Sequence, residues 1–182
     1  MKHNGNWKVL CGLELSPLLA QKTQEKGLDV VIGDMQHSSF RDGSFDIVTM
    51  WDVIEHLARP IKALEEIHRV LLPTGILIIA TPNAGSILHL LSLWMYRLGI
   101  EGLQKPARRV FAGHPLYFTL SSLSTLLARS GFLIRAVWQY SVSSEASRRE
   151  EWIERLAQIL DASLGRILRR RYRMVIVAQK GE

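Results

Sequence analysis

The chain has 182 residues and a hydrophobic content of 47%, which suits one folded domain with a substantial core. The net charge of +6 suggests nucleic acid as a possible partner. However, the basic run near Arg170 lies at the end of a predicted helix, where cations offset the helix dipole, and no cluster of base-stacking aromatic residues accompanies it. Nucleic-acid binding is therefore not favoured. The single Cys11 excludes an internal disulfide, and with no signal-peptide pattern after Met1 it predicts a cytoplasmic location.

The first predicted elements are a strand, a helix and a second strand. Residues 8–15 form a short apolar stretch that carries Glu14 near its end, and Ser16 reads as the cap of the following helix. Residues 29–32 carry three consecutive β-branched apolar residues, Val30, Val31 and Ile32, which predicts a strand covered on both faces. Asp34 follows this strand closely, so an acid marks the end of each strand.

The third predicted strand, over residues 45–50, stops in a polar turn. This turn holds Trp51, Asp52, Glu55 and His56. Ligands of open α/β sheets bind outside the carboxyl ends of parallel strands, where loops and helix N-termini converge. We therefore expect the chemistry of the protein at this turn.

Helices and strands continue to alternate along the rest of the chain. The predicted elements are helix 61–72, strand 76–81, helix 121–130 capped by Ser121 or Ser122, strand 132–138, helix 151–168 and strand 172–179. This alternation predicts βαβ units, a parallel sheet and an α/β fold.

Five motifs occur in a recognisable order between about Trp7 and Lys180. They are Glu14-Leu15-Ser16-Pro17, Gly33-Asp34, the run from Phe45 to Leu57, the run from His68 to Gly75 with its following strand, and Gly113-His114-Pro115 through Gly131-Phe132. Together they resemble class I S-adenosylmethionine-dependent methyltransferases of the type 11/23 kind, most closely the group that includes the ubiquinone-biosynthesis O-methyltransferases. The resemblance implies a Rossmann-like methyltransferase sheet, mostly parallel, with an antiparallel last strand.

One part of the family pattern is missing from this chain. The fold normally opens with a strand and a Gly-x-Gly-x-Gly turn, and no such turn occurs here. The resemblance places the missing strand between the Glu14 strand and the Phe45 strand. We therefore expect a single, N-terminally truncated domain over residues 1–182, with a gap in the centre of its sheet that weakens or abolishes cofactor binding.

The resemblance implies S-adenosylmethionine as the cofactor. The Glu14 carboxylate would accept the two ribose hydroxyls, and Asp34 would accept the adenine amine, with Met35 adding backbone and an apolar surface. The other cofactor-binding candidates are Leu15, Ser16, Trp51 and Asp52. The alternative is that both acids only cap local turns.

The polar turn supplies the catalytic candidates. His56 has an ordinary pKa near neutrality and is the expected general base, with Glu55 beside it; alternatively, His56 only hydrogen-bonds a neighbour. Asp52, Glu55, His56 and the distant His114 also resemble the divalent-metal set of some O-methyltransferases, since positions 52, 55 and 56 would share one helical face. Metal-free relatives carry the same Glu-His pair, so a metal is the less favoured reading.

Residues 84–114 are predicted to form a lid or acceptor-binding insertion. The part from 87 to 98 is apolar nearly all round but too short to span a membrane. We expect Trp94, Tyr117 and His114 to contact an apolar or aromatic acceptor, although plain packing is an alternative. Basic residues next to this segment also admit peripheral contact with a membrane.

The resemblance thus implies methyl transfer to a small-molecule or lipid-like acceptor, with O-, C- and N-methylation and the oligomeric state left open. The alternative is a noncatalytic methyltransferase-like binding module, which would tolerate the loss of the glycine turn. A nicotinamide dehydrogenase is not favoured, because its glycine-rich turn and its tyrosine-lysine spacing are absent.

Overall fold

The computed structural model describes residues 9–99, 115–141 and 152–181, with the backbone alone for 152–158. Helices and strands alternate along it, as the sequence predicts. In chain order they are β1 (Cys11–Glu14), α1 (Pro17–Gln24), β2 (Asp29–Ile32), β3 (Phe45–Trp51), the 3-10 helix η1 (Ile54–His56), α2 (Pro60–Val70), β4 (Leu71–Pro82), α3 (Ile87–Arg97), α5 (Leu120–Arg129), β5 (Phe132–Tyr140), α6 (Trp152–Ile167) and β6 (Arg173–Lys180).

The described strands form two separate sheets. One has two strands in the order β1-β2, and the other has four in the order β3-β4-β6-β5. The pairs β1-β2 and β3-β4 are parallel, whereas β6 runs antiparallel to both β4 and β5. The antiparallel last strand is confirmed. No ladder of hydrogen bonds joins β1 to β3 in the described residues, so the sheet is divided where the sequence predicts a gap.

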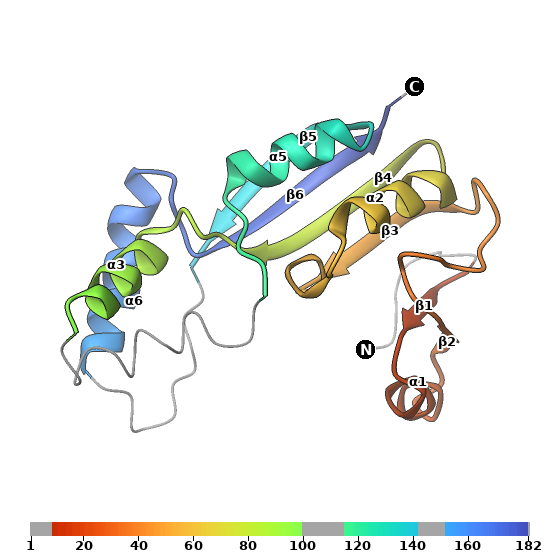
Figure 1. Ribbon diagram of the computed structural model, residues 1–182, viewed down its shortest axis with the longest axis horizontal. Coiled ribbons are helices and arrows are strands. Elements are labelled where there is room, and N and C mark those ends of the chain that lie inside the picture. The colour runs from red at the N-terminus through yellow and green to blue at the C-terminus, as the bar shows by residue number, and fades with distance from the viewer. Residues whose placement is uncertain (1–8, 100–114, 142–151, 182) are drawn as a thin grey trace.

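The β1-α1-β2 unit stands beside the β3 edge of the larger sheet (Figure 1). Its helix begins as predicted, because the Ser16 hydroxyl accepts a hydrogen bond from the Leu19 amide at 3.4 Å. Ala20 is the one fully buried hydrophobic residue among the described residues of this unit, and none of its side chains belongs to the main core. Strand β2 is mostly exposed, so the prediction that both of its faces are covered is wrong.

The main core lies between the four-stranded sheet and helices α2 and α5, which cover the same face of that sheet (Figure 1). The helices contribute Leu64, Ile67, Leu123 and Leu127, and the strands contribute Leu77, Ile79, Met174, Ile176 and Ala178. Burial of each large side chain stabilises the fold by about 1.5 to 3 kcal/mol. On β5, side chains such as Val137 stay exposed.

Two predicted boundaries are wrong. Strand β4 begins at Leu71 rather than Ile76, because Leu71 pairs with Phe45 and the backbone turns at Thr74 with a φ of 65°. Helix α5 is capped by Thr119 rather than by Ser121 or Ser122, because the Thr119 hydroxyl accepts the Ser122 amide hydrogen in a capping box. Both differences depend on tertiary pairing or reciprocal contacts that periodicity does not report.

Candidate functional site

Glu14 and Asp34 lie at the same edge of the two-stranded sheet. Strands β1 and β2 are parallel, and Glu14 pairs with Ile32, two residues before Asp34. The Gly33 amide donates to the Glu14 carbonyl oxygen at 3.0 Å, which closes the ends of the two strands together. The structure therefore brings together the two acids that the sequence singles out.

Both carboxylates also hold their own turns. Oε1 of Glu14 accepts the Ser16 amide hydrogen at 2.8 Å, and Oδ1 of Asp34 accepts the Gln36 amide hydrogen at 2.9 Å. The Gln36 side-chain amide donates to the second oxygen of Asp34 at 3.2 Å. Glu14 keeps its second oxygen outside the turn contact, so capping and ligand binding are compatible at this residue.

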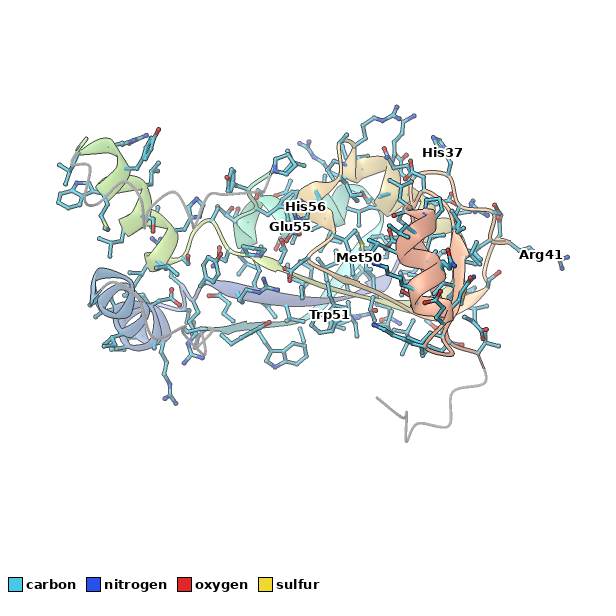
Figure 2. The ribbon with its side chains drawn as sticks, turned by 90° about the horizontal axis from the view of Figure 1, so that it is seen from below. His37, Arg41, Met50, Trp51, Glu55 and His56 are labelled. Carbon is cyan, nitrogen blue, oxygen red and sulfur yellow. The ribbon has the colours of Figure 1, made fainter. Side chains whose placement is uncertain are left out.

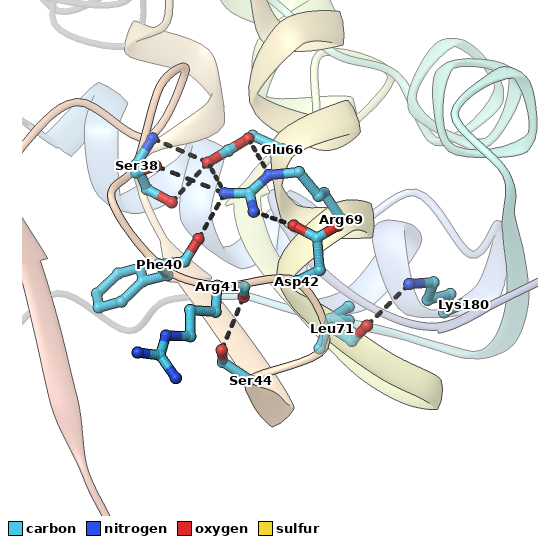
Figure 3. A network of polar contacts seen from close by, with 9 residues as sticks. All are labelled: Ser38, Phe40, Arg41, Asp42, Ser44, Glu66, Arg69, Leu71 and Lys180. Atoms are coloured by element: carbon cyan, nitrogen blue, oxygen red, sulfur yellow. Dashed lines mark hydrogen bonds and ion pairs between the residues drawn. The ribbon is translucent and has the colours of Figure 1, made fainter.

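The loop after Asp34 is anchored to helix α2 (Figure 3). Oε1 of Glu66 accepts hydrogen bonds from the amide and the hydroxyl of Ser38 at 2.9 and 2.6 Å. Arg69 donates to Glu66, to Asp42 and to the Phe40 carbonyl oxygen. The hydrogen bond from the Arg69 guanidinium lowers the pKa of Glu66 from 4.5 to about 2, so the carboxylate is held in its charged form.

Trp51 and Asp52 end strand β3 in the larger sheet. Trp51 is exposed, and Asp52 has a φ of 53°, a left-handed conformation that a residue without local compensation seldom adopts. The Asp52 amide donates to the Ala80 carbonyl oxygen at 2.9 Å, and its carboxylate pairs with Arg173 at 2.6 Å. Burial alone would lower the pKa of Arg173, but hydrogen bonds to Asp52 and Tyr140 raise it overall.

Glu55 and His56 lie together on η1, the short helix that follows β3 (Figure 2). Glu55 is only 1% exposed, and its Oε2 accepts a hydrogen bond from the Thr81 hydroxyl at 2.9 Å. His56 is exposed at the same turn. A buried carboxylate fixes the geometry of its surroundings, whereas an exposed imidazole can exchange protons with a ligand.

The predicted metal geometry is wrong. It required Asp52, Glu55 and His56 on one face of a helix, but Asp52 lies outside η1 and pairs with Arg173, and Glu55 turns into the core toward Thr81. Within the described parts of the chain, no three His, Cys, Asp or Glu side chains are close enough together to share a metal ion.

The predicted acceptor contacts lie on or near α3. Trp94 is 61% exposed, and Tyr117 contacts the His89 ring, with ring centroids 5.3 Å apart. His114 lies outside the described residues. None of the helices described here is long and apolar enough to cross a bilayer.

Sequence reasoning missed Thr81, Arg173 and Tyr172 at this end of the sheet. Thr81 stands at the carboxyl end of β4, a position that the rule for strand ends could have flagged. Arg173 and Tyr172 come from the start of the antiparallel β6, and burial raises the pKa of the Tyr172 hydroxyl. Their approach depends on the β4-β6 register, which no local pattern encodes.

Comparisons with known proteins agree with this geometry. Residues 1–79 match the family model described as methyltransferase domain. Over 72 residues the chain is 38% identical to a demethylmenaquinone methyltransferase from Paenarthrobacter aurescens (strain TC1), a match that covers 40% of this chain and 28% of that protein. The chain thus spans less than a third of this curated relative.

Solved structures share the fold over nearly the whole chain. A SAM-dependent methyltransferase from Thermotoga maritima superimposes with a TM-score of 0.66 at 22% identity, covering 95% of this chain and 73% of the other. The [4+2]-cyclase SpnF superimposes with a TM-score of 0.58 at 16% identity, covering 95% of this chain and 66% of the other. Residues 1–79 thus match the methyltransferase-domain model, and the chain has the Rossmann-like fold that is also seen in S-adenosylmethionine-dependent methyltransferases.

Proposed function

We propose that this chain binds S-adenosylmethionine and serves in the transfer of its methyl group to a small-molecule or lipid-like acceptor. The match of residues 1–79 to the methyltransferase domain supports the reaction class. The observation that carries the proposal is the placement of Glu14 and Asp34 at the adjoining ends of two parallel strands. In this proposal residues 1–182 belong to one methyltransferase domain, and no Gly-x-Gly-x-Gly turn occurs among them.

The donor set fits the adenosine half of the cofactor. Oε2 of Glu14, which does not take part in the hydrogen bond to the Ser16 amide, would accept hydrogen bonds from the ribose hydroxyls. Such charge-assisted hydrogen bonds are stronger than hydrogen bonds between neutral groups. Asp34 would accept the adenine amine, with Met35 and Leu15 supplying apolar surface. Met35 packs against the main core, so it also joins this end of the loop to the larger sheet.

The turn after β3 would act on the acceptor. Bound S-adenosylmethionine supplies an electrophilic methyl group. We assign His56 the role of taking a proton from a hydroxyl or amine acceptor, and its exposure to solvent supports this role. Glu55 is buried against Thr81, so we assign it the role of positioning this turn rather than of exchanging protons itself. The Asp52–Arg173 pair would hold the end of β3 in its left-handed conformation.

The acceptor would enter from the side of α3. Residues 84–114 are the proposed acceptor-binding insertion, and Trp94, Tyr117 and His114 remain its predicted contacts. Demethylmenaquinone, which the curated relative is named for, is the first acceptor to test. The acceptor that receives the methyl group will show whether the reaction is O-, C- or N-methylation. The cytoplasmic location of the protein remains a prediction.

Crosslinking with radiolabelled S-adenosylmethionine tests the cofactor site. No glycine turn is present in the described residues to contact the methionine half of the cofactor. We therefore expect a dissociation constant above the micromolar range. Ultraviolet crosslinking is suitable because it captures weak binding. Glu14→Gln should lower labelling about 10- to 100-fold, the equivalent of one charged hydrogen bond. Glu25→Gln, at the exposed residue that follows α1, is the matched control. Equal labelling of both variants would remove the assignment of Glu14.

A noncatalytic binding module is the second candidate. The divided sheet favours it, and the similarity to a cyclase shows that this fold is not restricted to methyl transfer. Incubation with labelled cofactor and demethylmenaquinone separates the two candidates. Transfer of label to the quinone supports the enzyme, whereas protein labelling without transfer at any cofactor concentration supports the module.

A further inference from the structure

Helix α3 exposes a stripe of large apolar side chains. Leu90, Trp94 and Leu98 follow one another at intervals of four residues, so they lie along one side of the helix. Trp94, with 61% of its surface exposed, is the most exposed of the three. Isolated exposed apolar residues are ordinary in proteins, but a contiguous stripe on one helix marks an interaction site.

The described part of α6 and the residue that follows it add a second apolar stripe. Leu164, Ile167 and Leu168 are exposed at spacings of three and four, and Ile167 reaches 76%. The two helices are joined at one end, because the Ile87 amide donates to the Arg170 carbonyl oxygen at 3.0 Å. Both helices lie side by side at the end of the molecule opposite the β1-α1-β2 unit (Figures 1 and 2).

The exposed charges that the structure describes at this end have one sign. In residues 84–99 and 159–171, the exposed charged side chains are all arginines, and they are Arg97, Arg166, Arg169 and Arg170. The one acid in these stretches, Asp161, is 1% exposed, and it accepts the Tyr172 amide hydrogen at 3.1 Å. The described surface of this end therefore combines exposed apolar side chains with exposed arginines.

This combination distinguishes between possible occupants. A second copy docked through the same surface would bring arginines against arginines, which opposes association. A bilayer with anionic phospholipids offers negative headgroups to the arginines and an apolar interior to the stripes. Neither helix is long enough to cross the bilayer, so both would lie along its surface.

We propose that the α3-α6 end docks on bilayers that contain anionic phospholipid. Leu90, Trp94 and Ile167 enter the boundary between headgroups and acyl chains, and the arginines contact the headgroups. Long arginine side chains suit this position, because their stems lie along apolar surface while the guanidinium stays in the polar layer. Trp94 is also a predicted acceptor contact, but the docking is measured without acceptor or cofactor, so its test does not depend on the methyl transfer proposed above.

Vesicle flotation with the full chain tests the docking. The probes are vesicles of phosphatidylcholine alone and vesicles with about one third phosphatidylglycerol. The protein should float with the anionic vesicles, and raising NaCl from about 0.1 M to about 0.5 M should release it, because surface charges are screened. Each Arg→Gln change at positions 166, 169 and 170 should weaken binding about fivefold, the equivalent of ~1 kcal/mol per arginine.

Matched variants distinguish docking through the α3-α6 end from nonspecific binding to vesicles. Trp94→Glu should abolish flotation, whereas Trp138→Glu, on exposed β5 with 56% of the tryptophan exposed, should leave it unchanged. Arg129→Gln on α5 is the control for the arginine changes. Circular dichroism of each variant verifies that the fold is kept.

Three results would overturn the docking. The first is equal flotation with both kinds of vesicle, and the second is equal loss of flotation with Trp94→Glu and Trp138→Glu. The third is that the wild type does not bind anionic vesicles but forms dimers, and that Trp94→Glu dissociates these dimers. Crosslinking to labelled S-adenosylmethionine is measured separately, so a failure of docking and a failure of the proposed function are distinguishable.

Discussion

Glu66 carries a charge that the fold stabilises. Its carboxylate accepts hydrogen bonds from Ser38 and Arg69, and the pKa of about 2 records how strongly the folded state favours the charged form. Only 13% of the side chain is exposed, so solvent screens the pairing incompletely. Through this residue, helix α2 fixes the loop that begins at Asp34.

The stability of the protein should therefore depend on pH through Glu66. A carboxyl whose folded pKa is depressed stabilises the fold fully above its unfolded pKa, near 4.5, and this contribution disappears as the pH falls toward 2. Glu66→Gln should lower the free energy of unfolding by about 2 kcal/mol at pH 7, with the difference from the wild type shrinking below about pH 4.5. Urea unfolding between pH 3 and pH 7 measures this.

Glu65→Gln is the control, because Glu65 is the exposed neighbour on the same helix. Its substitution should change the free energy of unfolding by less than about 0.5 kcal/mol at any pH. A Glu66→Gln difference that stays constant from pH 7 to pH 3 would show that charge pairing is not its cause.

At the scale of elements, the connection between α5 and β5 depends on a glycine. Gly131 has a φ of 81°, and a Cβ atom added there would lie 2.9 Å from Nε2 of His68. His68 is itself held by an edge contact with the Phe132 ring, with centroids 5.4 Å apart. The helix can end and the strand can begin here only because this residue has no side chain.

Gly131→Ala should destabilise the protein by about 2 to 4 kcal/mol, because backbone strain adds to a steric clash. Gly43→Ala is the matched variant. Gly43 also has a positive φ, of 58°, but the nearest side-chain atom would lie 3.7 Å from the new Cβ. It should therefore cost only about 1 kcal/mol of strain. Thermal unfolding compares the two, and equal losses would show that the contact with His68 is unimportant.

Sequence patterns predicted most elements but few of their ends. Helical spacing located α2, because its buried residues recur on one face. The start of β4 escaped the same reasoning, since Leu71 also fits the helical pattern and becomes a strand residue only by pairing with Phe45. The local sequence thus determines that an element forms, whereas its first and last residues depend on which neighbouring element hydrogen-bonds to its backbone.

At the scale of the whole molecule, the described chain has two parts that differ in how much hydrophobic core stabilises them. The four-stranded sheet shares one core with α2 and α5, whereas the β1-α1-β2 unit contributes nothing to that core. A two-stranded sheet is at best marginally stable by itself. The predicted cofactor acids belong to the weaker part, and Trp51 and Asp52 belong to the stronger one.

Amide hydrogen exchange should reveal this difference. The amides of β1 and β2 should exchange at least about 100-fold faster than those of β4 and β6, because few buried contacts oppose local opening of the unit. Mass spectrometry of peptides from each strand measures the rates at neutral pH. Equal protection of β2 and β4 would show that the unit opens only with the whole protein.

The sequence by itself determined the α/β alternation, the acids at the strand ends, and the absence of a glycine turn, because these follow from residue type and short-range spacing. The tertiary structure decided which strand ends meet and which side chains they meet. Arg173 reaches Asp52 from 121 positions away, and Thr81 reaches Glu55 from another strand. Such contacts depend on register and on which face of the sheet is covered, and both are set by the packing of the whole chain rather than by any local pattern.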